Sequence, residues 1–213
     1  MQLDSLQHLF LQEYGEYNNF TSWLAILMVL AACDLHTSII RAKLDYENDL
    51  NRYAFSILTL ASIITIILYI FVLINRDAVA DILGINEQYF HIMFIYILFA
   101  EAYNVFITVE RAHYRYKTFS LITGLAIVLS SFLSVLLVFV LNNKLNARIY
   151  GQYIPYICIG IIMYMFIARR EHKINFGYYK YALVLSLPLV PHLLSLTVLS
   201  SSDRIMITKI AGA

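Results

Sequence analysis

Long apolar runs separated by short polar loops dominate the pattern of this chain of 213 residues. Each run is long enough to cross the hydrocarbon core of a bilayer, which takes roughly 20 helical residues. The apolar positions are continuous rather than alternating, which argues against the period-two strands of outer-membrane barrels. The six runs are residues 20–40, 54–74, 89–107, 119–141, 149–167 and 181–199.

This pattern predicts an all-α fold, a polytopic membrane helical bundle with about six transmembrane helices. Residues 1–19 are expected to form an external N-terminal segment, because they are too polar to span. Residues 200–213 are expected to begin an external loop. Composition agrees, since 61% of the residues are hydrophobic and only 14% are charged.

Charge in the loops predicts the orientation of the bundle. Three alternate loops carry ten of the fifteen Lys and Arg residues, whereas the opposite side carries three. Because Lys and Arg accumulate in cytoplasmic loops, residues 41–53, 108–118 and 168–180 are expected inside and residues 1–19 outside.

The motifs of soluble enzymes and metal sites are absent from the sequence. Cys33 and Cys158 lie inside predicted spans, without the spacing of metal ligands. No glycine-rich phosphate loop and no hydrolase or metalloprotease motif occurs. We therefore expect no enzymatic activity, no metal or cofactor, and no nucleic-acid partner.

Two acids inside the apolar runs are candidate functional residues, because a charge in a span usually faces protein or a wet cavity. Asp34 lies in the first run, near His36, and Arg41 follows seven residues later on the same helical face. Glu101 opens a longer stripe in the third run. At about 100° per residue, Asn104, Thr108, Arg111 and Arg115 follow it on one face.

This stripe changes from an acid to two arginines at the predicted cytoplasmic mouth. Arginine is the preferred fork for phosphate, so the face would suit an anionic headgroup arriving from the inner leaflet. We predict that it lines a wet, substrate-facing surface. The alternative is an interhelical ion pair beside ordinary loop arginines.

The last run contains a second candidate region. Pro188 and Pro191 remove two backbone donors and predict a kinked helix. In lipid such a break needs protein or water to satisfy the freed carbonyls, and broken helices often border transport sites. His192 is expected to line the cavity, and Asp203 and Arg204 are expected to act with the prolines as a gate or hinge. The alternative is a structural kink capped by an interfacial ion pair.

The same residues carry a family resemblance. Residues 179–195, followed by Leu199 and residues 203–207, resemble the seventh helix of the polysaccharide flippases. These belong to the multidrug/oligosaccharidyl-lipid/polysaccharide exporter superfamily and translocate O-antigen and capsule repeat units. Residues 14–17 (YGEY) resemble the loop between the first two helices of that family. Residues 147–151 (ARIYG) resemble the start of its sixth helix.

The resemblance implies half of a two-bundle exporter fold facing a central cavity. It implies transport of lipid-linked oligosaccharide by alternating access across the bacterial cytoplasmic (inner) membrane. The family's first helix would precede residue 1 and its second bundle would follow Ala213, so an N-terminal-half fragment of a longer protein is expected. Implied partners are the lipid-linked oligosaccharide, membrane lipids, and polysaccharide polymerase and chain-length proteins.

Three alternatives from other classes stay open. A cation-coupled multidrug exporter of similar fold would use the intramembrane acids rather than the arginines. A membrane-bound transferase would need an acid–base constellation, for which the chain offers only scattered histidines. A non-transporting membrane subunit is the third.

Overall fold

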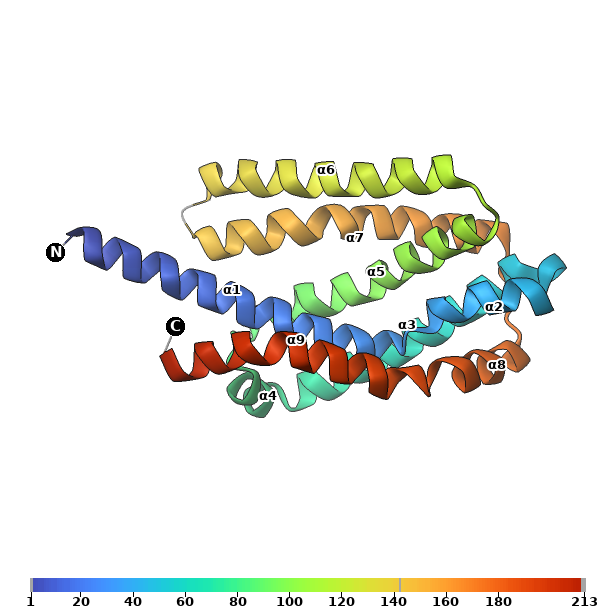
Figure 1. Ribbon diagram of the computed structural model, residues 1–213, viewed down its shortest axis with the longest axis horizontal. Helices are drawn as coiled ribbons and strands as arrows, with labels where there is room; N and C mark the ends of the chain where they lie inside the picture. The colour runs from blue at the N-terminus through green and yellow to red at the C-terminus, as the bar shows by residue number, and fades with distance from the viewer. Residues whose placement is uncertain (1, 142, 212–213) are drawn as a thin grey trace.

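The computed structural model describes the backbone of residues 2–141 and 143–211, and the side chains of residues 13–141, 143–202 and 206. Within these ranges the regular structure is entirely helical (Figure 1). The helices are α1 (Gln2–Ala32), η1 (Leu35–Thr37), α2 (Ser38–Asp45), η2 (Glu47–Asp49), α3 (Leu50–Ile74), α4 (Arg76–Leu83), α5 (Gln88–Ala112), α6 (Tyr116–Val140), α7 (Lys144–Arg170), α8 (Phe176–Ser186) and α9 (Leu189–Ala211).

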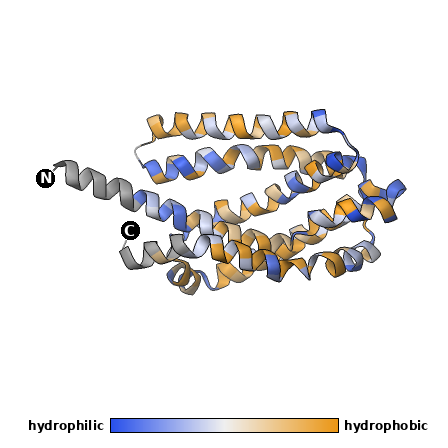
Figure 2. Ribbon diagram, in the orientation of Figure 1, coloured by the Kyte–Doolittle hydropathy of each residue, from blue (hydrophilic) through white to orange (hydrophobic). Residues whose placement is uncertain are grey.

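The long helices run along a common axis as a bundle. Helices α6 and α7 form an antiparallel pair along one edge, α1 and α9 lie side by side, and α3 and α5 also pack together (Figure 1). The loops that follow α2, α5 and α7 gather at one end, and the α6–α7 turn and α4 lie at the other. Apolar residues cover the helix bodies and hydrophilic residues concentrate near the helix ends (Figure 2).

The lengths and composition of the helices fit a membrane. Helices α5, α6 and α7, and α3 together with η2, are each long and apolar enough to cross one. The total reaches six if each of two bent helix pairs counts as one span. The protein is thus an all-α polytopic helical bundle, as the apolar runs predict.

The first predicted span is not one helix, which corrects the sequence interpretation. Residues 13–32 and 35–45 are bent by 56° at a break between them. Cys33 and Asp34 have φ of 46° and 51°, the left-handed region that non-glycine residues seldom adopt. No proline or glycine marks this break, so the pattern gave no signal for it. Asp34 and Arg41 consequently do not share the face of a continuous helix.

The end of the chain also differs from expectation. Residues 200–211 continue α9 instead of beginning a loop. These residues contain no proline or glycine, and the first such residue is Gly212. Because nothing in this stretch interrupts the backbone ladder, the helix runs on past the apolar run.

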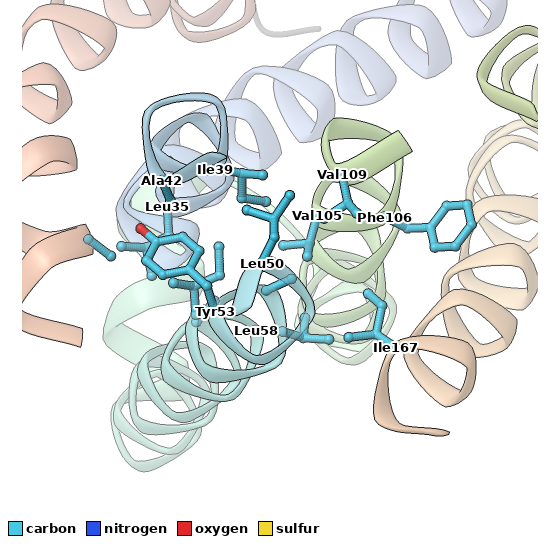
Figure 3. Packing of buried hydrophobic residues seen from close by; sticks show 14 of the residues in the cluster. Leu35, Ile39, Ala42, Leu50, Tyr53, Leu58, Val105, Phe106, Val109 and Ile167 are labelled. Atoms are coloured by element: carbon cyan, nitrogen blue, oxygen red, sulfur yellow. The ribbon is translucent and has the colours of Figure 1, made fainter. Parts of the chain in front are cut away.

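Two hydrophobic cores hold the bundle together. The first joins η1, α2, α3, α5, α7 and α8, and its centre includes Leu35, Tyr53 and Val105 (Figure 3). The second joins α1, α3, α4, α5 and α7 at the opposite end and includes Phe20 and Ile97. The first broken span therefore contributes α1 to one core, and η1 and α2 to the other.

Candidate functional site

The break in the first span places three ionisable side chains together inside the bundle. His36 lies in η1, where its Nδ1 is 3.3 Å from Oε1 of Glu101 on α5. Its Nε2 is 3.5 Å from Oδ1 of Asp34. The Glu101 side chain is only 2% exposed, and its second oxygen, Oε2, is buried without a hydrogen-bond partner in the structure. We call Asp34, His36 and Glu101 the acid–histidine–acid cluster.

Local hydrogen bonds hold the backbone in the broken conformation. The Thr37 hydroxyl donates to the carbonyl of Asp34 over 2.8 Å, and the Ser38 hydroxyl lies 2.6 Å from the carbonyl of Leu35. Ser38 also shares a hydrogen bond of 2.6 Å with the Tyr53 hydroxyl. Side chains of this type offer the backbone an alternative to the helical ladder, so they stabilise a short turn between two helices.

The predicted kink in the last span is confirmed. Residues 176–186 and 189–202 are bent by 51°, at the position of Pro188. The carbonyl of Leu187, which Pro191 cannot bond, accepts instead from the Val190 N–H over 3.3 Å. The Ser195 hydroxyl donates to the carbonyl of Pro191 over 2.8 Å. The Val190 N–H therefore replaces one of the two ladder bonds that the prolines interrupt.

The two breaks meet inside the bundle. Ser186, the last residue of α8, is fully buried, and its hydroxyl lies 3.5 Å from the carbonyl of Asp34. Helix α8 contacts η1, and α1 packs along α9, so the two bent spans lie against each other on both sides of their breaks (Figure 1). The acid–histidine–acid cluster lies at this crossing, which neither run of sequence could reveal alone.

The stripe expected from Glu101 to Arg115 is divided in the structure. Helix α5 ends at Ala112, and Tyr114, with φ of 57°, turns the chain before Arg115. Arg115 therefore does not lie on the α5 face, which corrects that part of the interpretation.

The remaining members of the stripe have different surroundings. Thr108 is buried and donates to the carbonyl of Asn104 over 2.7 Å. Arg111 is exposed, with its guanidinium carbon 5.7 Å from the centre of the Phe119 ring. Without Arg115, the wet surface stays a prediction for Glu101, Asn104, Thr108 and Arg111.

The other predicted residues have separate places. Arg41 is exposed on α2, and Pro188, Pro191 and His192 are exposed near the second break. The side chains of Asp203 and Arg204 lie outside the described residues, so their part in the expected gate stays a prediction.

Comparison of the sequence with known proteins shows the family of the chain. A family model described as "Polysaccharide biosynthesis protein" matches residues 9–213, nearly the whole chain. The chain belongs to the polysaccharide biosynthesis protein family. The matched range includes both breaks and all three cluster residues. No curated protein and no solved structure matches the chain.

This polysaccharide biosynthesis protein contains a second buried acid that the sequence analysis missed. Glu110 on α5 is 1% exposed, and its Oε1 lies 3.2 Å from Arg170 and 3.5 Å from Arg115. The Arg170 guanidinium packs over the rings of Phe106 and Phe166, at 5.6 and 4.5 Å. The group ties together the ends of α5, α6 and α7. An acid one turn before an arginine-bearing loop was the available signal, but Arg115 was assigned to the substrate-facing stripe and Arg170 was counted only as a loop charge.

Proposed function

We propose that this chain translocates a lipid-linked oligosaccharide, a polysaccharide repeat unit, across the cytoplasmic membrane by alternating access. Membership of the polysaccharide biosynthesis protein family supports the substrate class. The observation that carries the proposal is the crossing of two broken spans at Asp34 and Ser186, beside the buried Glu101. Broken helices that meet at polar groups within a bundle are typical of secondary transporters.

The division of the core gives this crossing a mechanical role. Residues of α1 belong to one hydrophobic core, whereas residues of η1, α2 and α8 belong to the other. Packed cores resist deformation, so a change of shape concentrates where the backbone passes between them. The break at Cys33 and Asp34 is such a passage, and the Ser186 contact couples it to the second break.

Arginines at one end of the bundle supply an approach for the substrate. Arg41, Arg111 and Arg115 are all exposed at the end that the charge count assigns to the cytoplasm. The aromatic contact with Phe119 orients Arg111. An oriented, exposed guanidinium suits the diphosphate of a lipid-linked sugar, because its N–H groups match phosphate oxygens in pairs.

The test uses proteoliposomes that contain the chain and a fluorescent undecaprenyl-diphosphate oligosaccharide. An impermeant glycosidase added outside reports the rate at which the sugar changes sides. The wild type is expected to expose the sugar, and Glu101→Gln is expected to slow this by about tenfold, equivalent to about 1.4 kcal/mol in barrier height. Glu16→Gln, at an exposed position of α1, is the matched control. Sugar movement no faster than in protein-free vesicles would contradict the proposal.

One observation favours a second candidate, a cation-coupled multidrug exporter. The ionisable groups at the crossing of the breaks are two acids and a histidine, side chains that can take up and release protons. The same vesicles loaded with ethidium distinguish the two. Ethidium export driven by an imposed ion gradient, without sugar movement, would replace the first function with the second.

A further inference from the structure

A cavity lies at the end of the bundle that carries the α6–α7 turn, away from the crossing of the breaks. It has a volume of about 620 Å³ and is bounded by α1, α6 and α7. Tyr14, Tyr17, Val138 and Leu145 form most of its wall. The cavity is therefore mainly apolar, and the end of α6 forms one of its sides.

The charged groups of this cavity are concentrated in α7. Arg148 is exposed, and its guanidinium carbon lies 4.3 Å from the centre of the Tyr17 ring and 5.5 Å from that of Tyr14. Contact with ring faces fixes the plane of the guanidinium while leaving its N–H edges for another acceptor. Within residues 13–141 and 143–202, the ion pairs of the structure do not include Arg148.

Lys144 adds a second fixed cation. Its ammonium donates to the carbonyl of Val138 over 2.6 Å and to that of Leu141 over 3.3 Å, at the end of α6. Glu13 is the acid of the wall, so two cations face one carboxylate and the cavity is positive on balance. Such a balance favours an anionic ligand.

The surface beside the cavity defines the rest of the ligand. Val135 and Phe139 on the last turns of α6 are 59% and 85% exposed. Side chains of this kind on a membrane helix face acyl chains rather than water. A ligand at this place thus meets cations at its head and an apolar helix along its tail.

We propose that this cavity binds an anionic phospholipid, with the phosphate on Arg148 and Lys144 and an acyl chain along the end of α6. The site is separate from the crossing of the breaks and does not rest on the transport proposal. Charge complementarity selects the headgroup, because a zwitterionic lipid offers the same phosphate but adds a cation beside Arg148.

Native mass spectrometry of the purified chain tests this proposal. The protein is released from detergent with equal amounts of dioleoylphosphatidylglycerol and dioleoylphosphatidylcholine. Phosphatidylglycerol is expected to be retained in preference to phosphatidylcholine. Arg148→Gln is expected to lower its retention by about tenfold, because charge-assisted hydrogen bonds to phosphate are lost. Arg76→Gln, an exposed arginine on α4 at the same end of the bundle, is the control.

Arg148→Lys protects the test against a folding defect, since it keeps the charge and the stem but loses the fork. Retention by this variant is expected between that of the wild type and that of Arg148→Gln. Equal retention of the two lipids, or equal loss in Arg76→Gln and Arg148→Gln, would overturn the proposal. Complete displacement of phosphatidylglycerol by millimolar inorganic phosphate would also overturn the proposal, because the site would then recognise phosphate alone and not the lipid.

Discussion

Glu101 and Glu110 lie on the same helix and are both almost fully buried, yet their surroundings differ. Glu110 is neutralised by Arg170 and Arg115, so its burial is compensated by charge. Glu101 contacts the imidazole of His36 and has one carboxylate oxygen without a partner. A buried polar group that is only partly satisfied is costly, and such groups concentrate where function requires them. Glu110 is therefore structural, and Glu101 is the functional candidate.

Removal of the Glu110 carboxylate provides a stability test of this distinction. Glu110→Ala is expected to lower the free energy of unfolding in detergent by about 1–3 kcal/mol, because two arginines lose their partner. Arg115 is 55% exposed, so solvent reduces its share. Glu87→Ala is the control, since Glu87 is 43% exposed and pairs with Arg76 at 3.7 Å. A change within about 0.5 kcal/mol is expected there. Equal effects of the two substitutions would contradict the structural role of Glu110.

The sequence indicated some of these residues and not others for physical reasons. A charge in an apolar run is costly wherever it lies, so Asp34 and Glu101 could be identified without coordinates. Their connection through His36 could not, because it depends on two left-handed residues that carry no glycine or proline signal. Arg115 was misplaced for a similar reason, since the turn at Tyr114 ends α5 before the expected stripe does.

At the scale of elements, close helix contacts depend on small residues. A Cβ added at Gly160 on α7 would lie 2.2 Å from the carbonyl oxygen and 2.7 Å from the carbonyl carbon of Phe99 on α5. Both atoms belong to backbone, which cannot rotate away as a side chain can. Small residues at such contacts let helices approach closely in membranes. Gly160 thus sets the distance between α5 and α7.

Alanine substitutions at two glycines test this contact. Gly160→Ala is expected to lower the free energy of unfolding by about 1–3 kcal/mol, because the helices must separate. Gly124→Ala on α6 is expected to be neutral or to stabilise by up to about 1 kcal/mol through helix propensity alone. The space around a Cβ at Gly124 is open within 4 Å. Equilibrium unfolding in mixed micelles measures both, and a loss of stability in Gly124→Ala as large as in Gly160→Ala would refute the explanation.

The elements themselves were largely predictable, because a bilayer imposes a length and composition that the apolar runs display directly. The kink of the last span was predictable because proline lacks the backbone N–H that a helix needs. The break of the first span and the helical continuation through residues 200–211 were not. Local hydrogen bonds of Thr37 and Ser38, together with the Ser38–Tyr53 contact, stabilise the first, and the absence of a breaker before Gly212 accounts for the second.

At the scale of the whole molecule, two bent spans cross at their breaks, and the first of them contributes to both hydrophobic cores. Alternating access requires the halves on either side of such a crossing to move relative to each other. The break at Cys33 and Asp34 lies between the two cores, and the buried Ser186 hydroxyl touches its carbonyl from the other span. If the crossing is the moving part, fixing it must stop transport without unfolding either core.

A reversible cross-link at the crossing tests this claim most directly. Cys33 is retained, Cys158 is replaced by serine, and Ser186→Cys supplies the second thiol for a short bifunctional methanethiosulfonate. The chain without Ser186→Cys is the control. Cross-linking is expected to slow movement of the lipid-linked oligosaccharide by about tenfold or more, with recovery after reduction. Unchanged sugar movement in fully cross-linked protein would contradict the account.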